Sequence, residues 1–157
     1  MRRLKSKSGF SLVEVAMALA IAVFCLVVMM GLLPVGLTSS RASTGETAAN
    51  GILNEVVSDL RATVPTSPIG GAATSQQFKI AIPASTGNGT TSTTLYFTGQ
   101  AVSTGTVLTA GSLYKLTVNF SANTGKTASV GIAKVTWPAA AANPSGSVES
   151  FVALDRN

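Results

Sequence analysis

The chain has 157 residues, only 11% of them charged, and its mean hydropathy of +0.42 comes mainly from the first 37 residues. It contains no histidine and one cysteine, Cys25, which excludes internal disulfides, imidazole zinc sites and His-activated nucleophiles. Its net charge of +5 is concentrated in Arg2, Arg3, Lys5 and Lys7, four of the 11 basic residues. The seven basic and six acidic side chains that remain do not make a nucleic-acid-binding surface.

An apolar run extends from Phe10 to Leu37. As a helix it would span about 42 Å, more than the roughly 30 Å of a hydrocarbon core. The run is longer than the core of a cleaved secretory signal and does not end at a small-residue cleavage site. The basic N-terminal flank predicts a single-pass topology with the N-terminus in the cytoplasm and the C-terminal domain outside, in the periplasm.

Residues 8–14 read Ser-Gly-Phe-Ser-Leu-Val-Glu, and Glu14 is the one charged residue of the apolar run. A carboxylate there is costly unless a partner neutralises it or it snorkels to the interface. Together with the basic leader, Gly9, Phe10 and Glu14 resemble the processing site of type IV prepilins and type II secretion pseudopilins. The resemblance implies cleavage after Gly9 by a prepilin peptidase and N-methylation of Phe10 by the same enzyme. It also implies that Glu14 pairs with the new amine of Phe10, most usefully in a neighbouring subunit, because paired buried charges offset each other's desolvation.

The same resemblance implies a non-enzymatic subunit of a type IV pilus-like or type II secretion pseudopilus filament. Its expected partners are the peptidase, other pilin or pseudopilin subunits, membrane lipid, and an inner-membrane assembly platform with its ATPase. The segment 31–37, Gly-Leu-Leu-Pro-Val-Gly-Leu, also looks like a pilin-like cassette family from Verrucomicrobia, and Pro34 predicts a helix kink. Two alternatives are a monomeric, signal-anchored periplasmic binding domain and a small anchored enzyme.

The predicted organisation is a leader at 1–9, a membrane and assembly helix at 10–37, an amphipathic continuation at 38–64 and a β-rich domain at 65–157. Beyond Thr38, apolar residues recur every three or four positions and define one helix face. These residues are Ala48, Ala49, Ile52, Leu53, Val56, Val57 and Leu60. The helix is expected to end near 62, before Pro65 and Pro68.

The remaining sequence predicts short strands at 77–82, 94–98, 114–120, 129–137 and 148–154. In the third of these, Leu116, Val118 and Phe120 are expected to face the core. A helix followed only by strands predicts an α+β fold in which a small antiparallel sheet packs on the apolar face of the helix. The resemblance implies that this is a pilin-like fold.

Two pairs of residues have spacings known from enzymes. Ser112 and Lys115 have the Ser-x-x-Lys spacing of penicillin-recognising acyl enzymes, but in a strand they would point to opposite sides. Glu55 and Asp59 are four residues apart on the helix, and we interpret them as a solvated face rather than an acid–base pair. The sequence therefore predicts no catalytic residue.

Three further segments are assigned structural roles. Residues 123–127 predict a hairpin turn and not a phosphate-binding loop, because a strand follows them. The loop 139–147 has no acidic residue for a calcium site, so no metal or cofactor is predicted. Trp137 is expected to cap the core, with an exposed binding patch as the alternative.

Overall fold

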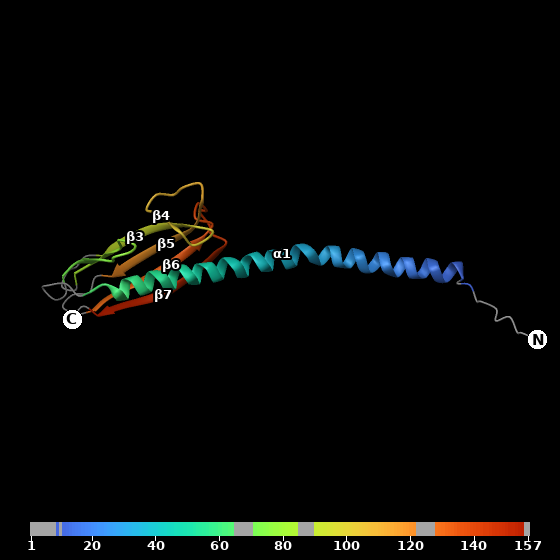
Figure 1. The fold of residues 1–157 in the computed structure, drawn as a ribbon, viewed down its shortest axis with the longest axis horizontal. Helices are drawn as coiled ribbons and strands as arrows, with labels where there is room; N and C mark the ends of the chain where they lie inside the picture. The colour runs from blue at the N-terminus through green and yellow to red at the C-terminus, as the bar shows by residue number, and fades with distance from the viewer. Residues whose placement is uncertain (1–8, 10, 65–70, 85–89, 122–127, 156–157) are drawn as a thin grey trace, which may run out of the picture. The chain divides into compact units, whose positions relative to one another are not determined.

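The computed structural model describes residues 9, 11–64, 71–84, 90–121 and 128–155. The fold is α+β, as predicted: one long N-terminal helix and a five-stranded antiparallel sheet (Figure 1). The chain divides into two compact units, residues 1–41 and residues 42–157.

Helix α1 runs from Leu12 to Ala62 and contains 51 residues. Its helical assignment is continuous through Pro34. One turn further on, the Thr38 hydroxyl donates to the carbonyl oxygens of Pro34 at 3.1 Å and Val35 at 3.0 Å. Such back-bonding occupies carbonyl oxygens next to the proline, and it often accompanies a bend. The kink at Pro34 stays a prediction.

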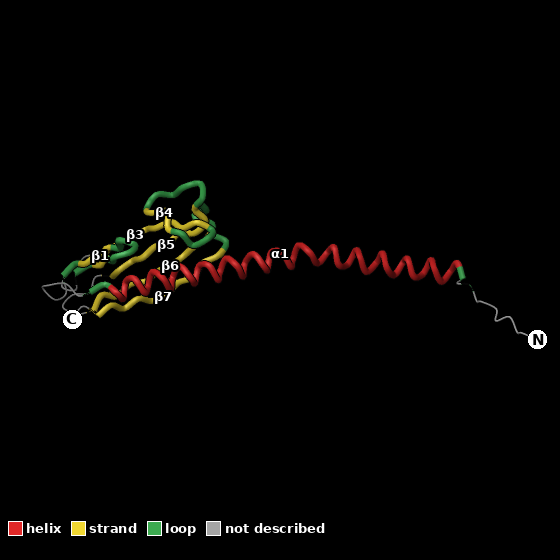
Figure 2. Tube along the Cα trace, viewed as in Figure 1, coloured by secondary structure: helices red, strands yellow, loops and turns green. Residues whose placement is uncertain are grey.

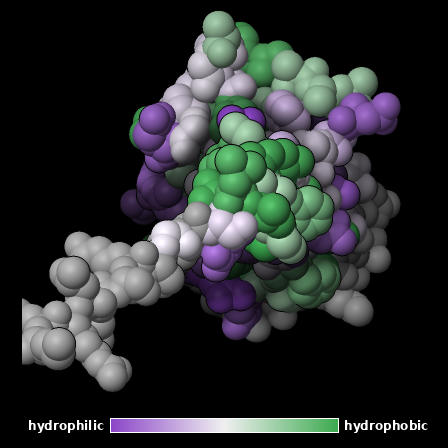
Figure 3. All heavy atoms as spheres, turned by 90° about the vertical axis from the view of Figure 1, so that its right-hand side faces the viewer, coloured by the Kyte–Doolittle hydropathy of each residue, from purple (hydrophilic) through white to green (hydrophobic). Residues whose placement is uncertain are grey.

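In the first unit, every described residue from Ser11 to Arg41 is exposed. Seen end-on, the N-terminal part of α1 presents an apolar surface around the helix axis (Figure 3). In the described part of the chain, α1 is the one helix long and apolar enough to cross a membrane. A helix that is apolar on all sides is typical of a segment covered by lipid or by other helices. The N-terminal part of α1 is therefore suited to anchor the chain in a membrane.

The second unit contains the C-terminal part of α1 and all the strands. The main sheet has the order β4-β3-β5-β6-β7, with every pair antiparallel. Its strands are β3 (Thr91–Thr98), β4 (Ser103–Gly105), β5 (Ser112–Ser121), β6 (Ala128–Trp137) and β7 (Gly146–Asp155). A separate two-stranded sheet pairs β1 (Ala73–Thr74) with β2 (Ala81–Ile82) (Figure 2).

The core lies between the C-terminal part of α1 and one face of the main sheet. Ile52 and Val56 from the predicted apolar face are fully buried. Leu116, Val118 and Phe120 of β5 are buried in the same cluster, which confirms their predicted inward direction. Side chains two apart on a strand share a face, so the intervening residues of β5 point to the other side of the sheet.

The predicted strand at 77–82 is wrong over most of its length. Residues 76–78 form a turn, Lys79 has a φ of 55°, and strand β2 covers only Ala81–Ile82. The alternating pattern is misleading because Asp59 binds the backbone N–H groups of Gln77 and Phe78, which a strand would use for pairing.

Candidate functional site

The predicted processing segment lies mostly outside the described residues. Arg2, Arg3, Lys5, Lys7 and Phe10 belong to this undescribed part. Gly9, which directly precedes the expected cleavage point, is exposed and has no helix or strand assignment. Cleavage after Gly9 and N-methylation of Phe10 stay predictions.

Glu14 lies in the first turn of α1, and its side chain is exposed. The Glu14 N–H donates to the carbonyl oxygen of Ser11 at 3.0 Å. A carboxylate in the first turn interacts favourably with the positive end of the helix dipole. Beside it, Val15, Ala18, Leu19 and Ala22 line a shallow hollow on the helix surface. The small alanine side chains therefore leave space next to the one charge of the apolar run.

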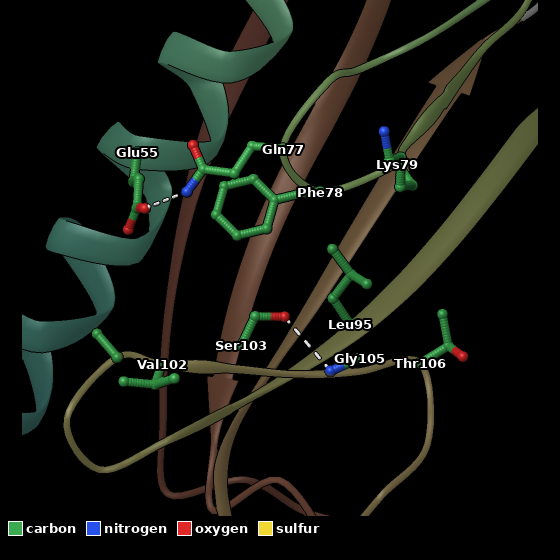
Figure 4. A pocket seen from close by; sticks show the side chains of 10 residues that line it. Glu55, Gln77, Phe78, Lys79, Leu95, Val102, Ser103, Gly105 and Thr106 are labelled. Atoms are coloured by element: carbon green, nitrogen blue, oxygen red, sulfur yellow. Dashed lines mark hydrogen bonds between the residues drawn. The ribbon is translucent and has the colours of Figure 1, made fainter.

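The second unit carries an open groove of about 630 Å³, enclosed by α1, the turn at 76–79 and the segment 101–106 (Figure 4). The buried side chains of Phe78 and Leu95 form its apolar floor. The other lining residues are Glu55, Gln77, Lys79, Ala101, Val102, Ser103, Gly105 and Thr106. The groove thus combines an apolar floor with charged and hydroxyl groups at its rim.

One wall of the groove is held in place by Asp59. Its two carboxylate oxygens accept hydrogen bonds from the N–H groups of Gln77 and Phe78, each at 3.0 Å. Burial tends to raise the pKa of Asp59. Hydrogen bonds outweigh this effect and hold that pKa below 3.8, its ordinary value; they come from the Ser75 hydroxyl and from the N–H groups of Gln77, Phe78 and Gln76. The interpretation of Asp59 as part of a solvated helix face is therefore wrong. Asp59 is buried, and its carboxylate binds the backbone of the turn at 76–79.

The opposite wall is a tight turn between β3 and β4. The Thr98 hydroxyl oxygen accepts hydrogen bonds from the N–H groups of Gln100 and Val102, both at 3.3 Å. The Thr98 N–H donates to the carbonyl oxygen of Val102 at 2.9 Å, and Ala101 takes a φ of 62°. Side-chain to backbone hydrogen bonds of this kind fix the geometry of short turns.

Two residues of opposite charge lie on either side of the Phe78 ring. Glu55 projects from α1 and accepts a hydrogen bond from Gln77 Nε2 at 2.6 Å, whereas Lys79 lies on the far side of the ring (Figure 4). Both residues are exposed. Within the described ranges, neither Glu55 nor Lys79 takes part in an ion pair.

Ser112 and Lys115 both lie on β5. The Ser112 hydroxyl contacts polar groups of Thr104 and Thr109. Its oxygen accepts from the Thr109 N–H at 3.1 Å and lies 2.9 Å from Thr109 Oγ1 and 3.2 Å from Thr104 Oγ1. These contacts tie the loop after β4 to the start of β5.

Two other predictions concern the turn at 123–127 and metal binding. The predicted turn at 123–127 lies outside the described residues. The described residues contain no group of three or more acidic or cysteine side chains arranged to hold a metal ion.

Trp137 packs at the end of the core, as expected. Its ring lies 6.0 Å from that of Tyr114 in an edge-on arrangement, and it is partly buried against the core cluster. Two glycines make room for the indole: a Cβ at Gly45 would lie 3.0 Å from Trp137 Nε1, and a Cβ at Gly146 would overlap the ring. The indole therefore joins α1 to the ends of β6 and β7.

Sequence reasoning missed the groove, although one signal for it is present. Asp59 follows Ile52 and Val56 at helical spacing, so an acidic residue lies on the apolar face of α1. A buried carboxylate needs donors, and this requirement points to a nearby turn that presents backbone N–H groups. No comparable signal marks Ala101 or Ser103.

The chain matches no protein-family model, no curated protein and no solved structure. The fold and the terminal helix define a class: an α+β protein whose apolar N-terminal helix can anchor in a membrane, followed by a β-domain.

Proposed function

We propose that this protein is a structural subunit of a filament of the type IV pilus or type II secretion pseudopilus kind. In this proposal the chain is inserted in the inner membrane with its N-terminus in the cytoplasm. A prepilin peptidase then cuts after Gly9 and methylates Phe10. An assembly platform and its ATPase move the subunit from the membrane into the filament.

The observation that carries the proposal is the arrangement of charge along α1. Its exposed apolar surface from Leu12 to Leu37 bears a single carboxylate, Glu14, in the first turn. Lipid and neighbouring apolar helices cover such a surface equally well, so the same helix can exist in the membrane and in a filament core. A lone carboxylate in either setting requires a cationic partner.

The proposed partner is the free amine that cleavage after Gly9 creates on Phe10. The amine of the same chain would lie four residues before Glu14, and the amine of a neighbouring chain could approach from outside. The hollow lined by Val15, Ala18, Leu19 and Ala22 leaves room beside Glu14 for an adjacent helix. A pairing between subunits would select one register out of many in an otherwise uniform apolar contact.

The test starts with the intact mass of the protein extracted from membranes. We expect loss of residues 1–9 and one added methyl group, and accumulation of the full-length form when the peptidase gene is deleted. A mature chain that still begins at Met1 in the presence of the peptidase would overturn the proposal.

Assembly is tested separately by Glu14→Gln, with Glu46→Gln as the matched control on the exposed surface of the same helix. Cys25 is the one cysteine and is exposed on α1, so oxidation reports contact between helices of different subunits. We expect Glu14→Gln to reduce Cys25 cross-linking and filament recovery by at least about tenfold, the effect of about 1.4 kcal/mol. Equal cross-linking in both variants would contradict the role assigned to Glu14.

A second candidate is a monomeric binding domain held at the membrane by an uncleaved anchor, and the groove of the second unit favours it. This candidate predicts an intact N-terminus and the same behaviour for Glu14→Gln as for wild type. The mass measurement and the cross-linking therefore separate the two candidates.

A further inference from the structure

We propose that the groove between α1, the turn at 76–79 and the segment 101–106 binds a short peptide with free ends. The ammonium group of the peptide would lie at Glu55, its carboxylate at Lys79, and an apolar side chain over Phe78 and Leu95. This site uses no residue of the apolar N-terminal part of α1 and would exist whether or not the chain enters a filament.

The charges of the groove point to a ligand with two opposite charges. Glu55 and Lys79 line the same groove on opposite sides of the Phe78 ring, yet they form no ion pair with each other or with another described residue (Figure 4). The Glu55 side chain is oriented by the hydrogen bond from Gln77 Nε2 at 2.6 Å. A ligand with a single charge would satisfy one end of the groove and meet the wrong charge at the other.

The floor of the groove requires an apolar group between these charges. Phe78 and Leu95 are only 8% and 4% exposed, and Val102 is exposed at the rim. The hydroxyl residues Ser103 and Thr106 also line the groove, and the Ser103 oxygen accepts a hydrogen bond from the Gly105 N–H at 3.3 Å. An apolar floor with a few polar groups at fixed positions is the usual composition of small-molecule sites.

The walls have the rigidity expected of a binding site. Lys79 and Ala101 are the two non-glycine residues with positive φ in the described part of the chain, at 55° and 62°, and both line this groove. Such conformations cost about 1–3 kcal/mol each and persist where the surroundings impose them, often at functional sites. Here Asp59 holds the first turn and Thr98 holds the second.

The size of the groove fits a peptide of two or three residues. Its volume of about 630 Å³ falls within the roughly 300–1,000 Å³ of small-ligand pockets. An extended dipeptide or tripeptide is about 7–11 Å long. An internal segment of another protein would lack both terminal charges, so it would need side chains of both signs at the right spacing to pair with Glu55 and Lys79. A free peptide is therefore the occupant that the groove favours.

The experiment uses the full ¹⁵N-labelled chain in detergent micelles, titrated with the dipeptide Leu-Leu and followed by backbone NMR. Its matched ligands are N-acetyl-Leu-Leu and Leu-Leu-amide, and its variants are Glu55→Gln and Lys79→Gln. Glu149→Gln removes a carboxylate on β7, away from the groove, and serves as the control for net charge. Unchanged thermal unfolding confirms that each exposed substitution leaves the fold intact.

We expect saturable shifts confined to residues of the groove, with Leu-Leu bound about 3- to 10-fold more weakly by Glu55→Gln and by Lys79→Gln. Acetylation should weaken binding to wild type and abolish the effect of Glu55→Gln, and amidation should do the same for Lys79→Gln. This pairing of variant with ligand end is a readout that a purely structural role would not produce. The absence of saturable shifts with Leu-Leu and with Leu-Leu-Leu would overturn the proposal, as would binding of Leu-Leu to both groove variants that is as strong as its binding to wild type.

Discussion

Replacing Asp59 with alanine tests whether one buried carboxylate organises the groove wall. The substitution leaves the N–H groups of Gln77 and Phe78, which Asp59 binds at 3.0 Å, without their acceptor. An unsatisfied buried donor costs about 1–3 kcal/mol, and the Phe78 N–H is buried whereas the Gln77 N–H is part-buried. We therefore expect a loss of about 2–4 kcal/mol in the free energy of unfolding. At roughly 3–5 °C per kcal/mol for a unit of this size, the thermal midpoint should fall by about 6–20 °C. Asp59→Asn keeps one acceptor oxygen and should lose about half as much.

The assay is thermal and urea unfolding of the full chain in micelles, each followed by fluorescence of the single tryptophan, Trp137. Hydrogen bonds hold the pKa of Asp59 below 3.8, so its stabilisation is complete above the pKa of the unfolded chain and is lost as the pH falls through the lower folded value. Between pH 7 and pH 3 wild type should therefore lose more stability than Asp59→Asn. A loss of less than about 1 kcal/mol for Asp59→Ala at pH 7 would refute this reasoning, since a single net hydrogen bond is worth that much.

Four further substitutions are expected to destabilise, to stabilise, to remove a pH dependence and to have little effect, respectively, in the same unfolding assay. Gly146→Ala places a methyl group against the Trp137 ring and should destabilise by about 1–3 kcal/mol, whereas Gly51→Ala enters open space on α1 and should stabilise by up to about 1 kcal/mol. Burial raises the pKa of Tyr114 above 10.0, so wild type should lose stability as the pH rises through that folded value, and Tyr114→Phe should remove this loss. Glu149→Gln breaks an exposed ion pair of 3.5 Å with a lysine of β6 and should change stability by less than about 1 kcal/mol.

The fold could be predicted from the sequence wherever apolar residues recur periodically and all of them lie on one buried face. The apolar spacing of α1 and the alternation of β5 each place side chains on one face, and both faces are buried as expected. The ends of the helix and of the long strands differ from the predictions by a few residues. Strands β1 and β4 have two and three residues, which is too short for an alternating pattern to be visible.

The groove could not be predicted in the same way, because interactions between distant parts of the chain build it. Asp59 acts on a turn 18 and 19 residues further along, and Glu55 on Gln77 22 residues further along. The alternation of residues 77–82 favours a strand locally, but the carboxylate captures the N–H groups that the strand would need. Local propensity therefore failed at the place where a buried charge had to be satisfied.

The two parts of α1 differ in burial although they form one helix. No described residue up to Arg41 is buried, so the apolar surface there contributes nothing to the core of this chain and must be covered by lipid or by other proteins. From Gly45 onward the helix buries one face, and Ala49, Ile52 and Val56 supply core that the sheet lacks by itself. The second unit can therefore keep its core whichever apolar environment covers the first. In the proposed filament, the packing of these apolar surfaces is specific only if a charged group selects the partner, and we propose Glu14, the carboxylate of the described apolar surface, as that group.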